Sequence, residues 1–202
     1  INSFSFYNFW IRRERVQRVE WRGVLSERSL LRYNQVMAIL WSDDAWQVIQ
    51  ESAKLPDGRE KNVVRVKRPD AVHIMAFTDD DSILMLREYR PYYGTYIWML
   101  PSGRVDKETD IDAAAQRELR EETGFRAESI ERYCVTHYSE SVIAANYIYI
   151  ARDLVEDPLP QDDDEEIEVH AVSLKQALEN VLQSEYVHTA SAYALLRYLR
   201  EH

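Results

Sequence analysis

The sequence predicts an α/β protein in which a mixed β-sheet lies between layers of helices, preceded by an N-terminal extension. Short segments with the composition of strands run through most of the chain, with few helical segments between them. Strands that alternate with few helices favour a sheet covered by helices. The length of 202 residues is enough for one domain with a substantial core, or for one domain and an extension.

Residues 1–44 are the least regular part of the sequence and are interpreted as the N-terminal extension. Within them, residues 16–24 resemble a strand and residues 25–40 have the spacing of an amphipathic helix. Aromatic residues are dense near the start, at Phe4, Phe6, Tyr7, Phe9 and Trp10. They either pack on the protein's own domain or form a dimer contact, because aromatic residues and arginine are enriched in interfaces.

Residues 45–202 carry the regular structure and are interpreted as the main domain. A Pro56-Asp57-Gly58 turn separates the first two expected strands, and the next two are expected to pair across residues 78–81. The expected strands are 46–52, 62–66, 71–77, 82–88, 96–100, 133–138, 146–151 and 166–172, and two closing helices are expected at 174–183 and 186–200.

The most ordered segment is residues 103–125, where a glycine loop leads into an alanine-rich helix. Asp110 or Thr109 is expected to begin this helix, because each side chain can accept hydrogen bonds from free backbone N–H groups. Gly124 is expected to end it, since glycine readily adopts the left-handed conformation of a C-terminal cap.

Several acidic residues of this helix fall on the side that should face the core. At about 100° per residue, the apolar residues form one stripe, at Ile111, Ala114, Ala115 and Leu119. Glu118 and Glu122 fall near the middle of that stripe, and Glu121 falls on its edge. Ionised carboxylates that face a core are costly unless cations meet them. A solvated acidic face is the usual interpretation of a charge run, but three carboxylates on the core side favour a site for a hard cation such as Mg²⁺.

This segment resembles the Nudix box, a pattern of glycine, arginine and glutamate at fixed spacing. The matching residues are Gly103, Arg117, Glu118, Leu119, Glu121, Glu122, Gly124 and Phe125. The resemblance implies a Nudix-type α/β/α sandwich and binding of Mg²⁺, with Mn²⁺ as an alternative. Thr109 stands where the pattern has its first glutamate, which in the family pairs with the arginine and steadies the loop. Glu108 and Asp110 flank that position and could substitute.

Within this family, the chain most resembles the ADP-ribose pyrophosphatases and related nucleotide-sugar hydrolases, from about Trp46 onward. The carrying segments besides the box are residues 87–91, 100–103 and 165–169. The resemblance implies that Arg87 and Arg90 bind substrate, and guanidinium groups do suit a diphosphate. It also implies metal ligation by the Ser102 carbonyl, Glu118, Glu121 and Glu122.

The acidic run at residues 162–166 is the expected source of the catalytic base. Hydrolysis of a diphosphate needs a water molecule in line with the scissile bond and a carboxylate that takes its proton. By the resemblance, Glu165 is the choice for this base, with Asp163 and Glu166 as alternatives. The expected catalytic residues are therefore Glu165, Glu121 and Arg117.

Two departures from the ADP-ribose group bear on the substrate. Met99 stands where the group usually has glutamate, and residues 139–142 contain no proline or glycine where the group has a Pro-Gly loop. Because these residues shape substrate recognition in the group, ADP-ribose is only the leading candidate among related compounds.

Two classes of function are consistent with these residues. The first is a Mg²⁺-dependent hydrolase that cleaves a nucleoside diphosphate linked to another group, such as ADP-ribose or a nucleotide sugar, to a nucleoside monophosphate and a sugar phosphate. The second is a catalytically degenerate Nudix module that binds a nucleotide-sugar-like ligand in a regulatory role, for which Thr109 is the argument. The carboxylates at 118, 121 and 122 favour the enzyme, because a module that only binds gains nothing from them.

Composition bounds the partners and the compartment. A net charge of −10 argues against nucleic-acid binding, which needs basic surface. A single cysteine, Cys134, favours a reducing compartment and hence a cytoplasmic protein. No segment approaches the roughly 18 apolar residues of a membrane span, so no membrane partner is expected. A small nucleotide substrate and a homodimer are expected from the family resemblance, whereas His73 and His137 are expected to pack or hydrogen-bond.

Overall fold

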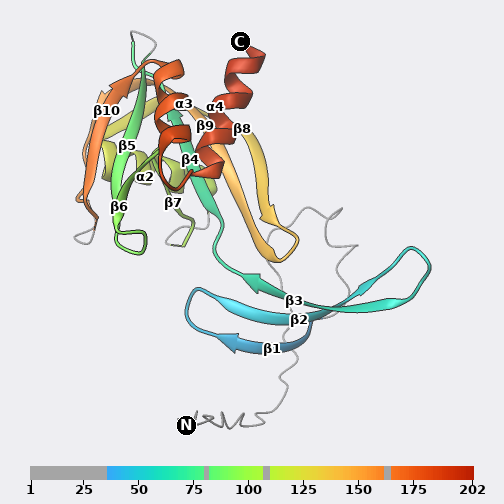
Figure 1. The fold of residues 1–202 in the computed structure, drawn as a ribbon. Coiled ribbons are helices and arrows are strands. Elements are labelled where there is room, and N and C mark those ends of the chain that lie inside the picture. The colour runs from blue at the N-terminus through green and yellow to red at the C-terminus, as the bar shows by residue number, and fades with distance from the viewer. Residues whose placement is uncertain (1–35, 80–81, 107–109, 162–164) are drawn as a thin grey trace, which may run out of the picture.

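The computed structural model describes residues 36–79, 82–106, 110–161 and 165–202 (Figure 1). The strand expected at 16–24, the aromatic residues 4–10, and Glu108, Thr109 and Asp163 lie outside these ranges.

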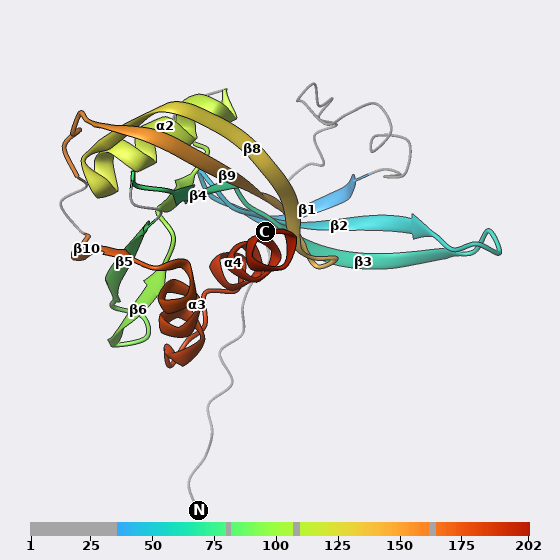
Figure 2. The same ribbon diagram turned by 90° about the horizontal axis from the view of Figure 1, so that it is seen from above.

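An antiparallel unit of three strands projects from the rest of the molecule (Figures 1 and 2). It comprises β1 (Val36–Ser42), β2 (Gln47–Lys54) and β3 (Glu60–Lys67). The expected helix over 25–40 is wrong for residues 36–40, which lie in β1. The reason is that Ile39 pairs with Ile49 of β2, and β-branched residues favour such pairing over an isolated helical turn. The expected boundary at residue 44/45 falls in the β1–β2 turn.

The main sheet is mixed, as expected. Its central strand, β9 (Val142–Glu156), pairs in parallel with β4 (Ala71–Ala76) and with the end of β3, and in antiparallel with β8 (Phe125–Ser139). A short strand that was not expected, β7 (Ser102–Arg104), lies beyond β4. This strand places residue 102 beside His73 of β4.

A second, antiparallel sheet has three strands. Its centre is β5 (Ile83–Arg90), between β6 (Thr95–Met99) and β10 (Ile167–Val172). The expectation that β4 and β5 pair as a hairpin is wrong, because the two strands belong to different sheets and meet at one isolated bridge between Phe77 and Ile83. β4 pairs instead with β9 and β7, and β5 pairs with β6 and β10.

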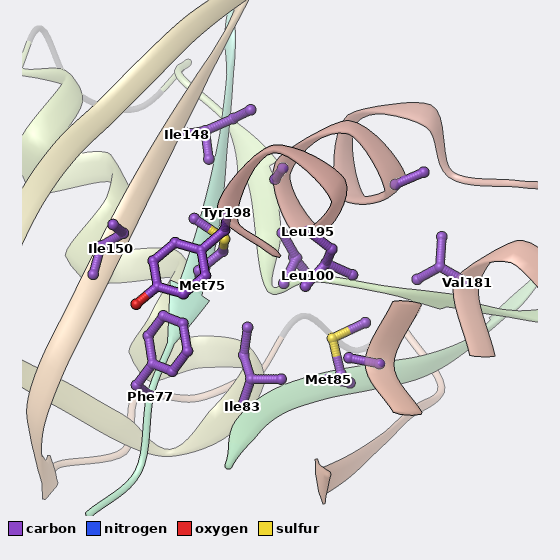
Figure 3. Packing of buried hydrophobic residues seen from close by; sticks show 13 residues of the cluster. Met75, Phe77, Ile83, Met85, Leu100, Ile148, Ile150, Val181, Leu195 and Tyr198 are labelled. Atoms are coloured by element: carbon purple, nitrogen blue, oxygen red, sulfur yellow. The ribbon is translucent and has the colours of Figure 1, made fainter. Parts of the chain in front are cut away.

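Helices cover both sides of the sheets, with α2 (Ile111–Thr123) on one side and α3 (Leu174–Gln183) and α4 (Thr189–Glu201) on the other (Figure 2). Alternate residues of β4 serve the two sides, since successive strand side chains point to opposite faces. Ile74 packs in the cluster with Leu119 of α2, and Met75 packs with Leu195 of α4 (Figure 3). The predicted α/β sandwich is thereby confirmed. None of the described helices is long and apolar enough to cross a membrane.

Candidate active site

Helix α2 begins and ends as the sequence predicts. Asp110 is the N-cap residue, and its side chain accepts a hydrogen bond from the Asp112 N–H at 3.0 Å. Gly124 is the C-cap at φ 80°, and its N–H donates to the Arg120 carbonyl at 3.1 Å. These two ends fix the register of the helix, and with it the direction in which each glutamate points.

Glu118 and Glu122 are buried on the core-facing side of α2, together with Ala114, Ala115 and Leu119. One carboxylate oxygen of Glu122 accepts a hydrogen bond from the Ser102 N–H at 2.7 Å. The carboxylate of Glu118 lies directly against Gly103, since a Cβ placed on Gly103 would stand 2.0 Å from Glu118 Cδ. The prediction that these two acids face the core is confirmed, and the loop before the helix is the surface they face.

Arg117 binds two of the neighbouring acids. Its guanidinium lies 2.8 Å from the Glu118 carboxylate and 2.5 Å from that of Glu121, and it also donates to the Arg104 carbonyl at 3.2 Å. Glu108 and Asp110 are the two acids that flank Thr109 in the sequence and could pair with this arginine in its place. Among the described residues, Glu118 and Glu121 do so, while Asp110 caps the helix.

The buried acids hold their protons strongly. Burial raises the pKa of Glu118 to about 7, against the opposing charge of Arg117. Burial and then the charge of Glu118 raise the pKa of Glu122 well above its usual value, and the Ser102 N–H opposes this only partly. Without a bound cation, burial therefore disfavours the charged form of both carboxyl groups.

Arg87 and Arg90, both expected to bind substrate, are not brought together. Three residues apart on β5, they point to opposite faces of the strand. Arg87 pairs with Glu168 at 2.9 Å and lines a hollow of about 310 Å³ with residues of β6 and α3. Arg90 lies 2.7 Å from Glu88 and donates to Met99 Sδ at 3.2 Å. Of the two, Arg90 is on the face that carries Glu88.

Glu165 lies near the helix carboxylates. Its charge contributes to the raised pKa values of Glu118, Glu122 and Glu88. The segment around it is anchored to β5, because the Tyr89 N–H donates to the Glu166 carbonyl at 3.0 Å. The Glu166 side chain instead accepts a hydrogen bond from the Tyr96 hydroxyl. The charge of Glu165 thus acts on the helix carboxylates, whereas the Glu166 side chain is bound to Tyr96, and Asp163 lies outside the described residues.

The donor set fits a hard divalent cation. Glu118 and Glu122 are buried, where their charged form is costly unless a cation meets it, and oxygen ligands are what Mg²⁺ prefers. Gly103 leaves the room that the Glu118 carboxylate occupies. In the described ranges, no three His, Cys, Asp or Glu side chains already converge at metal-binding spacing.

Glu88 was not singled out from the sequence, although it lies at the site. It is buried on β5, with Ile97 and Ile167 opposite it on the two neighbouring strands. The sequence feature that could have indicated its burial is the alternation of the strand. Leu84, Leu86 and Glu88 share one face of β5, and the first two are core residues.

Two histidine rings lie close together near this site: His73 is buried on β4 opposite Ser102, and His188 is partly buried at the start of α4. His73 Nε2 is 3.0 Å from Asn146 Oδ1, and its ring lies 5.3 Å from that of His188. Ser191 accepts from the Leu100 N–H, so its hydroxyl hydrogen is free to be donated to His188 Nδ1 at 2.7 Å. Burial lowers the pKa of His73 to about 4 and that of His188 to about 3. His73 thus packs and hydrogen-bonds as expected, and His137 is exposed on β8.

We expect His188→Asn to reduce the loss of stability in acid. A histidine whose pKa is depressed in the folded protein takes up a proton more readily in the unfolded chain. The free energy of unfolding therefore decreases as pH drops below about 6.5, the pKa of histidine in the unfolded chain. Between about pH 7 and pH 5 that loss is about 2 kcal/mol for one such histidine. The free energy of unfolding is measured in urea at both pH values for the variant and the wild type. Taking the difference between the two proteins removes the effect of Glu118 and Glu122, whose raised pKa values change stability with pH in the opposite direction. His137→Asn is the control, and an unchanged acid loss in His188→Asn would contradict the assignment.

The fold and the site together define an α/β enzyme with a carboxylate-lined site suited to a divalent cation. A model of the NUDIX domain matches residues 67–194. The chain is 31% identical over 151 residues to an ADP-ribose pyrophosphatase of Bacillus subtilis (strain 168), covering 72% of this chain and 80% of that one. The chain therefore belongs to the Nudix family and is a Nudix hydrolase.

Two further proteins are similar over most of their length. A methanol dehydrogenase activator of Bacillus methanolicus is 25% identical over 182 residues, covering 88% of this chain and 95% of the relative. A solved structure titled as an ADP compounds hydrolase matches with a TM-score of 0.66 at 23% identity, covering 83% of this chain and 94% of that one. The structural match supports the fold.

Proposed function

We propose that the protein hydrolyses the diphosphate bond of a nucleoside diphosphate linked to another group, with Mg²⁺ as cofactor. ADP-ribose is the leading substrate and nucleotide sugars are the alternatives; the products are a nucleoside monophosphate and a sugar phosphate. The observation that carries the proposal is the pair of buried acids, Glu118 and Glu122, packed on the Ser102–Gly103 loop. The similarity to an ADP-ribose pyrophosphatase supports the choice of substrate.

Each site residue has a role in this proposal. Glu118, Glu121, Glu122 and the Ser102 carbonyl would hold the cation, which would offset the charge of the diphosphate. Glu165 takes the proton of the attacking water, whose oxygen bonds to one phosphorus as the bridging P–O bond breaks and its electrons leave with the other phosphate. Arg117 keeps Glu118 and Glu121 in place. Arg90 donates to the diphosphate, and Arg87 is proposed as a second substrate contact.

The test measures the nucleoside monophosphate released with and without Mg²⁺, which is AMP from ADP-ribose and the corresponding monophosphate from each member of a panel of nucleotide sugars. Hydrolysis that requires the metal is the expected result. Mn²⁺ should replace Mg²⁺, since both accept oxygen ligands in octahedral geometry. Absence of hydrolysis on every compound would refute the proposed reaction.

A second candidate is a regulatory Nudix module that binds such a ligand without turnover. The observations that favour it are Thr109 in the box and the similarity to a methanol dehydrogenase activator. Binding of ADP-ribose by calorimetry, together with no product after long incubation with Mg²⁺, would identify this case.

We also propose that the protein is a cytoplasmic homodimer whose N-terminal part contributes to the contact between chains. The three-stranded unit β1–β3 projects from the domain, and its register places Trp41 and Val64 on one face. Both side chains are more than half exposed, at 53% and 56%. Exposed apolar side chains on a projecting sheet are typical of an interface. The single cysteine supports a reducing compartment.

We expect Val64→Glu to separate the dimer into monomers, because a buried unpaired charge at an interface is costly. Multi-angle light scattering at micromolar concentration measures the change as a halving of mass. Tyr92→Glu, at a 96% exposed residue in the β5–β6 turn, is the control and should keep the dimer mass. A wild type that is monomeric and fully active would rule out the dimer.

A further inference from the structure

Glu88 is a buried carboxylate with an oxygen that lacks a hydrogen bond among the described residues. Its side chain is only 4% exposed at the centre of the three-stranded sheet, between Ile97 and Ile167. The same position filled by an apolar residue would cost nothing in desolvation, and replacing a buried ion pair by apolar groups is often neutral or stabilising. Stability therefore does not explain a carboxylate here.

The one ion pair that the structure gives Glu88 does not satisfy it. Oε2 lies 2.7 Å from Arg90 Nη2, but the two groups lack hydrogen-bond geometry, and this oxygen is buried without a hydrogen bond in the described residues. Arg90 itself is 39% exposed and turns a donor toward Met99. A buried acceptor left open in this way calls for a group that the protein does not itself supply.

Three connections place Glu88 beside the helix acids. The next residue, Tyr89, is hydrogen-bonded to the Glu166 carbonyl, which brings the segment of Glu165 against β5. Arg90 touches Met99, and three residues later Ser102 binds Glu122. The charges of Glu88 and Glu122 are close enough that Glu88 helps to raise the pKa of Glu122. Helix, loop and strand thus surround one acidic region, with Glu88 on its sheet side.

We propose that Glu88 is an outer carboxylate of the metal site, which holds the hydration shell of the divalent cation from the sheet side. Mg²⁺ usually keeps several of its waters in proteins, and these need acceptors. The open oxygen of Glu88 supplies one, and its charge adds to those of Glu118 and Glu122. The inference rests on the metal site of the proposed function. In this arrangement the Glu88 carboxylate interacts both with Arg90 and with the hydrated cation, so Arg90 is not its sole positively charged partner.

The experiment measures binding of Mn²⁺ by electron paramagnetic resonance, without substrate. Loss of an outer partner of a metal ligand weakens metal binding roughly 10- to 100-fold, so Glu88→Gln should lower Mn²⁺ affinity by at least about tenfold. Arg90→Met should raise the affinity, because it removes a cation that competes for the same carboxylate. Glu168→Gln, which breaks the Arg87 pair on the opposite face, is the matched control for metal binding.

The outcomes separate this inference from the metal site itself. Glu122→Gln should abolish Mn²⁺ binding, and if it does not, the metal site fails. If Glu122→Gln abolishes binding but Glu88→Gln matches the wild type, only the role of Glu88 is overturned. A purely structural role is also excluded by the melting temperature, because metal-free Glu88→Gln should be at least as stable as the wild type. A marked fall in that melting temperature, with unchanged Mn²⁺ affinity, would show that Glu88 serves the fold.

Discussion

Glu122→Gln is expected to keep the fold and to lower turnover by roughly a thousandfold or more, a rise of about 4 kcal/mol in the barrier. The substitution preserves shape, and its side-chain oxygen can still accept the Ser102 N–H that Glu122 accepts at 2.7 Å. What it removes is an anionic oxygen from a site that must hold Mg²⁺ against water.

The same variant is expected to change the stability of the protein in a definite direction. The pKa of Glu122 is raised in the folded protein, so ionisation costs stability as pH rises above about 4.5. Metal-free Glu122→Gln should therefore be at least as stable as the wild type at neutral pH. Mg²⁺ should raise the melting temperature of the wild type more than that of the variant, because a ligand stabilises only a state that binds it.

Glu131→Gln, at an exposed position of β8, is the control for loss of one acidic charge and should leave turnover unchanged. Turnover near the wild-type value in Glu122→Gln, at saturating Mg²⁺ and substrate, would overturn the assignment of this residue to the metal.

Helix α2 could be predicted from the sequence because its signals are local. Asp110 and Gly124 mark its ends, and the spacing of four apolar residues fixes the face that carries Glu118 and Glu122. None of these signals depends on residues that are distant in the sequence. The two closing helices were also predicted: α3 has the expected bounds, whereas α4 begins at Thr189 and not at residue 186, and its N-cap residue makes no side-chain capping hydrogen bond.

Strand pairing could not be predicted in the same way. The residues between β4 and β5 indicate a turn, but β4 pairs with β9, where Ala71 lies opposite Asn146. The strands β8 and β9 are also longer than expected, because long antiparallel pairing carries both beyond their apolar segments. Which residues of β5 share the site depends on this arrangement. Arg87 and Arg90 were grouped by the family resemblance although they lie on opposite faces of β5, and Glu88 was missed although it shares a face with the core residues Leu84 and Leu86.

Gly103→Ala is expected to lower turnover by about a hundredfold, an increase of about 3 kcal/mol in the barrier. Gly103 does not have a positive φ, so alanine is not excluded by its backbone conformation. Its methyl group, however, would stand 2.0 Å from both Cδ and Oε1 of Glu118. The glutamate side chain must move, and a carboxylate assigned to the metal then leaves its position while the fold survives.

A double-mutant cycle separates this cause from a general disturbance of the loop. Glu118→Ala removes the carboxylate that the new methyl group would strike, so Gly103→Ala should have little further effect on turnover in that background. Residues in contact show such non-additive effects, whereas independent ones add. Gly94→Ala, in the β5–β6 turn, is a stringent control for glycine replacement away from the site, because its φ of 68° strains the backbone of an alanine there although no atom lies within 4 Å of the added Cβ. If Gly103→Ala lowers turnover equally with and without Glu118, the glycine acts on the loop itself, and the close packing of Glu118 on Gly103 is not what positions the acid for the metal.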